Sequence, residues 1–270
     1  MRPTYPKLKF NTLRAYFGKP YTIDLEDRAG SVTIYSPTMG DAYINADENN
    51  FMATLNIFTT NTTALRVFLD DLGMDWNEVT DFQLFMLLYK QADPEIVKLL
   101  FGDLDLQGFE LYQKRGKDDE DTHVVLYNKE QNVEIDEDVY QHIHQYLQDL
   151  FSIKPKEDII EDNLLKQWWI AKDRRQAKIA EKKKKEDVST IQPLISACVN
   201  HPGFKYKLYE VENMTVAEFW DSVARLQVYE SSTALMRGMY SGMISSKDIN
   251  PESYNFMRTI NNSESNNKTK

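Results

Sequence analysis

The chain has 270 residues, a mass of 31.6 kDa and a formal net charge of −10. A hydrophobic fraction of 41% supports a real core and excludes a globally disordered chain. The acidic balance disfavours a general nucleic-acid or membrane binder. The single cysteine, Cys198, excludes an internal disulfide. Residues 1–10 lack the apolar stretch of a signal peptide, and there is no apolar run of about eighteen residues, so we expect a soluble cytoplasmic protein.

Short strands are expected first, in residues 7–35, where Leu8 and Phe10 alternate with lysines and Val32 opens a β-branched run. A helical block should follow to about residue 102. Its apolar faces repeat at helical spacing, and Asp93-Pro94-Glu95 is a helix start with cap, proline and acid in order.

Strand character returns in residues 104–135, which predict a hairpin around the acidic turn 116–121. Asp136 should then cap a helix that carries Val139, Ile143 and Leu147 on one face. Strands before and after a helical block favour an α+β domain. We therefore predict a mainly helical α+β fold with this domain at its N-terminus.

The second half is predicted to be helical. A long charged helix from about residue 162 to 185 leads into a unit in which Thr215 and Glu218 form a capping box. The final residues are polar, a composition typical of disorder. The expected organisation is an α+β domain at 1–152, a linker and basic helix at 153–188, a helical C-terminal domain at 189–260 and a disordered tail at 261–270.

The sequence carries no motif for catalysis or for metal binding. His142 and His144 would point about 200° apart on a helix, which predicts two surface histidines and no shared metal. Asp103 and Asp105 resemble the start of a calcium loop, but Lys114 stands where that loop needs its final acid. We predict a non-enzymatic protein with no catalytic residue, metal or cofactor. An enzyme whose site has no recognisable motif is the alternative.

Eight basic residues lie between Lys172 and Lys185. Such density can hold phosphates, but aromatic residues that could stack on bases end at Trp169. A solvated linking helix that meets the acidic domain of the same protein is therefore favoured over a nucleic-acid site.

Two aromatic pairs and a methionine cluster are the candidate binding features. Adjacent residues on a helix point about 100° apart, so neither pair fits on one narrow stripe. Core packing between the two helices is one interpretation, and an apolar groove for a partner helix is the other. The candidate partner-binding residues are Trp168, Trp169, Phe219, Trp220, Met236 and Met239.

The order of short motifs along most of the chain resembles phage proteins encoded near the tail genes of Gram-positive bacteria. The motifs are Phe51-Met52-Ala53-Thr54-Leu55, Asp81-Phe82-Gln83-Leu84-Phe85, Phe101-Gly102-Asp103, Leu194-Ile195-Ser196-Ala197-Cys198-Val199 and Phe219-Trp220-Asp221. The resemblance implies a tail assembly chaperone in the host cytoplasm, which would bind and shield the tape measure protein or another tail protein. A virion structural protein or a host-factor-binding protein is the alternative, and self-association stays open.

Overall fold

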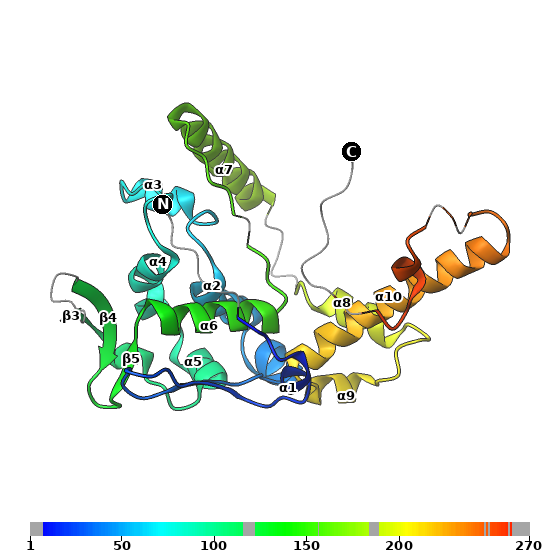
Figure 1. Cartoon of the computed structure of the whole chain (residues 1–270), viewed down its shortest axis with the longest axis horizontal. Helices are drawn as coiled ribbons and strands as arrows, with labels where there is room; N and C mark the ends of the chain where they lie inside the picture. Colours follow the sequence, from blue (N-terminus) through cyan, green and yellow to red (C-terminus); the bar gives the residue numbers. More distant parts are fainter. Residues whose placement is uncertain are drawn as a thin grey trace.

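The computed structural model describes residues 8–115, 122–155, 157–183, 189–245, 247, 249–258 and 260. Helices form 55% of these residues and accompany two small antiparallel sheets, which confirms the mainly helical α+β class. Figure 1 shows α6 (Glu137–Leu150) across the middle of the molecule, between a sheet at one end and the C-terminal helices at the other. Within the described ranges, no helix has both the length and the apolar character needed to cross a bilayer.

The remaining elements agree closely with the predicted order. The helices before α6 are α1 (Thr12–Tyr16), the π-helical turn η1 (Asp41–Asn45), α2 (Glu48–Thr59), α3 (Arg66–Asp71), α4 (Asp81–Leu88), the 3-10 turn η2 (Tyr89–Gln91), α5 (Pro94–Phe101) and the 3-10 turn η3 (Leu106–Gly108). Those after it are α7 (Asn163–Lys183), α8 (Gln192–Val199), α9 (Leu208–Asn213), α10 (Val216–Tyr240) and the 3-10 turn η5 (Pro251–Tyr254). The strands are β1 (Tyr21–Ile23), β2 (Val32–Ile34), β3 (Glu110–Arg115), β4 (Thr122–Asn128) and β5 (Val133–Ile135).

The predicted strand at Leu8 and Phe10 is wrong. This segment is irregular and leads into α1, whose first turn is capped by the Asn11 side chain. The ring of Phe10 packs 5.1 Å from the ring of Tyr146. This contact accounts for an apolar residue between polar neighbours without a sheet. The strands predicted at Tyr21 and Val32 are confirmed, since β1 and β2 pair antiparallel.

The predicted hairpin is also confirmed. β3 and β4 pair antiparallel, with Leu111 opposite Leu126, and β5 adds on the far side of β4. β3 is therefore an edge strand. The acidic turn 116–121 that the prediction placed between the strands lies outside the described residues.

Local capping chemistry explains where the helices begin. The Asp93 side chain accepts from the Glu95 backbone N–H (2.8 Å), and the Asp136 side chain accepts from that of Val139 (3.0 Å). Thr215 caps α10 by accepting from the Glu218 backbone N–H (3.1 Å). Each side chain satisfies a donor that the first turn of a helix leaves unpaired.

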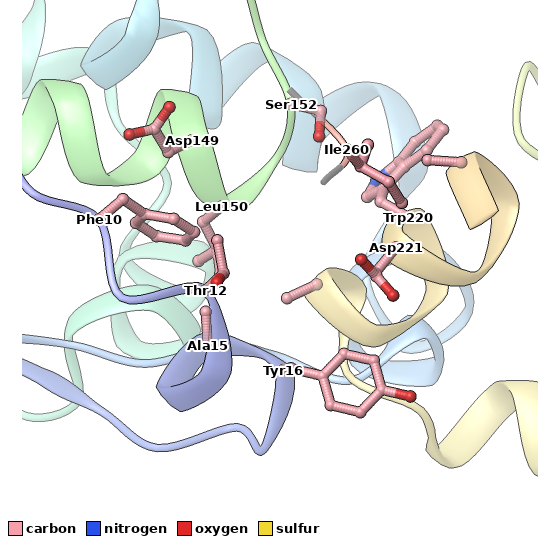
Figure 2. A pocket seen from close by; sticks show the side chains of 12 residues that line it. Phe10, Thr12, Ala15, Tyr16, Asp149, Leu150, Ser152, Trp220, Asp221 and Ile260 are labelled. Carbon is pink, nitrogen blue, oxygen red and sulfur yellow. The ribbon is translucent and has the colours of Figure 1, made fainter. Parts of the chain in front are cut away.

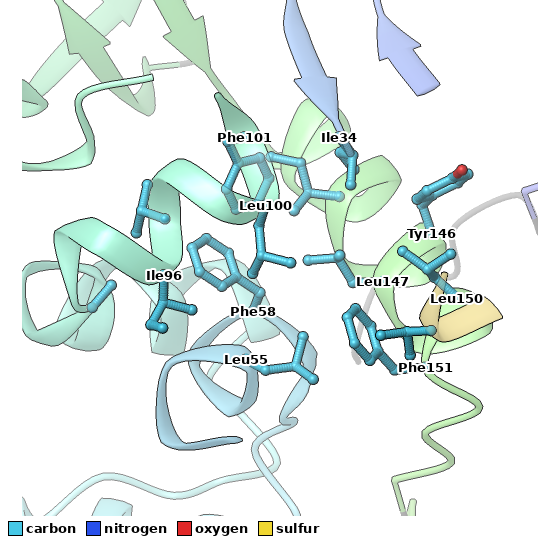
Figure 3. Close-up of a cluster of buried hydrophobic side chains, with 14 of the residues drawn as sticks. Ile34, Leu55, Phe58, Ile96, Leu100, Phe101, Tyr146, Leu147, Leu150 and Phe151 are labelled. Carbon is cyan, nitrogen blue, oxygen red and sulfur yellow. The ribbon is translucent and has the colours of Figure 1, made fainter. Parts of the chain in front are cut away.

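The main core lies between α2, α5 and α6. Figure 3 shows Leu55 and Phe58 of α2 facing Leu100 of α5 and Leu147 of α6, and all four side chains are buried. The rings of Phe58 and Phe101 lie 4.9 Å apart in the same cluster. Apolar faces at helical spacing on three helices thus bury one another.

The C-terminal helices join this same core. Cys198, Val211 and Phe219 belong to the main hydrophobic cluster, although each follows the long helix α7 in the chain. Burial raises the pKa of the Cys198 thiol, in keeping with a core residue. Backbone hydrogen bonds reinforce the junction, because Met39 donates to the Met214 carbonyl at 2.8 Å.

A second, smaller core holds α7. It consists of Leu69, Trp76, Leu84, Leu88, Ile160 and Ile170, with Trp169 packed against it. α3 contacts α7, and Figure 1 shows α7 lying above the body of the molecule beside α3. The predicted tail 261–270 and residues 184–188 of the predicted linker lie outside the described residues.

Candidate partner-binding surfaces

A small cavity lies between α1, the end of α6 and α10. Figure 2 shows Trp220 and Asp221 of α10 on one side, with Phe10 and Asp149 on the other. Its volume is about 80 Å³, whereas pockets for organic ligands hold roughly 300–1,000 Å³. The cavity has room for a few water molecules. Trp220 is half-buried along its wall.

The tryptophan pair of α7 divides between core and solvent. Trp169 is half-buried against the smaller core, and the Arg66 guanidinium lies 4.9 Å from its ring centroid. Trp168 is 54% exposed. The Lys172 ammonium lies 4.2 Å from the Trp169 ring and 5.1 Å from the Trp168 ring. The neighbouring residues point in different directions, as their helical spacing requires.

The second aromatic pair, Phe219 and Trp220, packs in the main core. Phe219 is fully buried in the main core and so presents no surface to a partner in this conformation. Its ring lies 5.9 Å from that of Trp220. The two pairs therefore pack into different cores and do not face one another.

Met236 and Met239 lie far along α10 from this pair. With a rise of about 1.5 Å per residue, Met239 is roughly 30 Å from Phe219. Both methionines are half-buried, and they share a helix face with Ser232, whose hydroxyl donates to the Ser253 carbonyl. The six candidate residues thus do not form a single groove.

An exposed stripe runs along α7 on the side opposite its buried residue, Ile170. At 100° per residue, the residues farthest from Ile170 form this outward stripe. Four of its side chains are large, apolar and exposed: Leu164 at 79%, Leu165 at 46%, Trp168 at 54% and Ile179 at 45%. The outward stripe consists of Leu164, Leu165, Trp168, Lys172, Arg175 and Ile179.

The distal half of α10 carries a second exposed surface. After Val223, Ser232 is the only buried residue of this helix, and residues 250–258 cover one side of it. Tyr240 is 89% exposed and Met243 is 87% exposed. The α10 arm surface consists of Tyr229, Tyr240, Met243, Phe256 and Met257, all of them exposed.

Sequence reasoning did not select the tyrosines or Phe256 of this surface. Tyrosine in the apolar pattern of a helix indicates a core as readily as a surface. A usable signal is the spacing of Tyr229, Met236 and Tyr240, which places them on one helix face.

The sequence also gave no indication of an apolar groove between α4 and the hairpin. Its volume is about 560 Å³, and Met74, Leu87, Leu111 and Val124 line it with exposed apolar side chains. Leu111 lies on the edge strand β3. The residues come from three separate segments, so no local pattern marks the groove.

Ion pairs in both directions join the first half of α7 to the α3 region. Arg66 binds Asp173 at 2.5 Å, and Arg174 binds Asp70 at 2.8 Å. Lys166 binds Asp75. Of the predicted basic run, Arg174 pairs with acids of the N-terminal domain, and among the side chains that the structure describes the ion pairs of α7 end there.

One expected surface histidine is buried. His144 donates from Nδ1 to the Phe58 carbonyl (2.8 Å), and its Nε2 accepts from the Gln148 side-chain amide (2.7 Å). This pattern requires the neutral ring, and burial lowers the pKa of His144. Among the described residues, no group of three or more His, Cys, Asp or Glu side chains could hold a metal ion.

Comparison with known proteins finds a family match for the C-terminal part of the chain. Residues 182–261 match a family model described as the YomV second domain, which suggests a protein family of Bacillus phage type. The match includes α8, α9, α10 and η5, and so the whole α10 arm surface. Neither a curated protein nor a solved structure matches the chain.

Proposed function

We propose that the protein is a non-enzymatic phage tail assembly chaperone, which binds and shields the tape measure protein during tail assembly. The α10 arm surface carries the proposal. Large apolar side chains that stay in solvent on a folded protein commonly mark a site for another polypeptide. The similarity of this region to a phage-type family supports a phage partner.

The chemistry of the α10 arm surface suits a long apolar helix. Met243 and Met257 are unbranched and flexible, so they can adapt to a succession of apolar side chains. Tyr229, Tyr240 and Phe256 add broad rings to the same region. The half-buried Met236 and Met239 would extend the contact if residues 250–258 shift.

Co-expression with the tape measure protein of the same phage tests this function. The wild-type chain should co-purify with the tape measure protein and increase its soluble yield. Tyr240→Ser combined with Met243→Ser should reduce both, whereas the control Leu13→Ser, at a residue 66% exposed on α1, should not. A wild-type chain that neither co-purifies nor raises the yield contradicts the proposal.

Mass spectrometry of purified virions separates the alternatives. An assembly chaperone leaves before the particle is complete, so the chain should be absent from virions. Stoichiometric presence in the particle would instead support a structural role.

A further inference from the structure

In the part of α7 whose side chains the structure describes, up to Ala180, the contacts with the body of the protein lie in the first half. Three residues of α7 form ion pairs with the α3 region: Lys166 with Asp75, Asp173 with Arg66, and Arg174 with Asp70. The last of these pairs is at residue 174. Every described side chain from 174 to 180 is exposed. An unsupported helix of this length is marginal in water. The second half of α7 is therefore well suited to gain stability from a contact outside its own protomer.

The charge changes sign between the residues just before α7 and the second half of this helix. Glu161 and Asp162 lie just before α7, and Arg175 and Lys178 lie in its second half. In the part of the chain that the structure describes, neither Arg175 nor Lys178 takes part in an ion pair. An antiparallel copy of the same helix would bring the basic half of each beside the acidic start of the other, twice by symmetry.

Apolar and basic residues of the outward stripe together have the spacing of a helix-pairing seam. Leu165, Trp168, Lys172, Arg175 and Ile179 follow one another at intervals of three and four residues. The orientation of a pair follows from the charges. A parallel copy would place every basic residue of the stripe against its own equivalent, whereas an antiparallel copy brings only Lys172, near the middle of the stripe, close to its equivalent.

We propose that the outward stripe of α7 binds the same stripe of a second copy of this chain, with the two helices antiparallel. If the helices cross between Ala171 and Lys172, Ile179 meets Leu164 of the second copy and Arg175 meets its Trp168. A guanidinium over an indole is a favourable cation–π pair. The small Ala171 permits close approach, and the Lys172 ammonium is turned back onto the rings of Trp168 and Trp169.

The position of the body is compatible with this pairing. The outward stripe lies opposite Ile170, the residue that α7 buries against its own body. The two bodies would therefore lie on the outer sides of the helix pair. The contact uses the same surface on both copies, so it closes at a dimer. It leaves the α10 arm surface free and is independent of the function proposed for that surface.

Sedimentation equilibrium of the full chain tests the dimer. The mass should rise from 31.6 kDa toward twice that value as the concentration increases. Trp168→Glu should raise the dissociation constant at least about tenfold, because it enters the contact twice. The matched control Leu13→Glu, at another exposed apolar side chain, should leave the constant unchanged. A wild-type chain that stays monomeric at about 200 μM, where a contact of micromolar strength would be mostly formed, overturns the inference.

A charge exchange tests whether the occupant is a second copy. Lys178→Glu should weaken the dimer by about fivefold, since each symmetric pair is a surface interaction of modest strength. Adding Glu161→Lys to that variant should restore the wild-type constant. Loss without restoration would contradict the antiparallel arrangement. A Trp168→Glu variant that keeps its dimer but loses the tape measure protein would assign the stripe to a foreign helix instead.

Discussion

Phe219 offers the sharpest test of how the C-terminal helices are held. Its side chain is fully buried in the main core, in a helix that begins 66 positions after the end of α6 in the chain. Replacing a buried phenylalanine by alanine removes its transfer free energy and leaves a cavity, at a cost of about 3–5 kcal/mol. For a chain of this size each kcal/mol lowers the Tm by about 2–4 °C. Phe219→Ala should therefore lower the Tm by roughly 10 °C.

Scanning calorimetry at neutral pH measures this effect, with Tyr240→Ala as the control in the same helix. Tyr240 is 89% exposed, so its replacement should change the stability by less than about 0.5 kcal/mol. Because Phe219 belongs to a core shared with α2 and α6, the shift should affect the main unfolding transition. A shift below about 2 °C, or one confined to a separate minor transition, would refute the shared core.

Three further outcomes follow from other contacts. The lowered pKa of His144 means that the unfolded chain binds a proton before the folded one, so stability should fall as the pH drops below 6.5. Urea titrations at pH 7.5 and 5.5 should show this loss, and His144→Gln should reduce it. Asp93→Ala removes the cap of α5 and should cost about 1 kcal/mol by urea unfolding, whereas Asp103→Ala should cost little. Arg66→Ala breaks the pair with Asp173 and should speed tryptic cleavage within α7, whereas Arg28→Ala should not.

Much of the fold could be predicted because its signals are local. Asp93, Asp136 and Thr215 cap helices through hydrogen bonds to residues two or three positions ahead, so a short window of sequence contains the whole interaction. α1 was missed because five residues are too few to show a helical period. The burial of Phe10 against Tyr146 depends on a partner more than a hundred positions away.

For the candidate binding residues, too, local sequence predicts the direction of a side chain but not its distant contacts. The sequence indicates that Trp168 and Trp169 point in different directions, but only the position of α3 decides which ring is buried. Phe219 was chosen as a contact residue because it is large and apolar, a property that core and surface residues share. Its burial depends on helices that lie far away in the sequence.

Both long helices extend beyond the core that holds them, and their sequences contain the reason. The buried stripe of α10 carries Val216, Phe219 and Val223, and then continues with Gln227 and Glu230 at the same spacing. Residues 250–258 pack on α10 beyond this point and support the helix where the main core ends. α7 instead continues after Asp173 through strong helix formers such as Arg174, Gln176 and Ala177. The exposed apolar residues that remain on these extensions do not stabilise the monomer, and the proposed contacts with another polypeptide would give a physical reason to keep them.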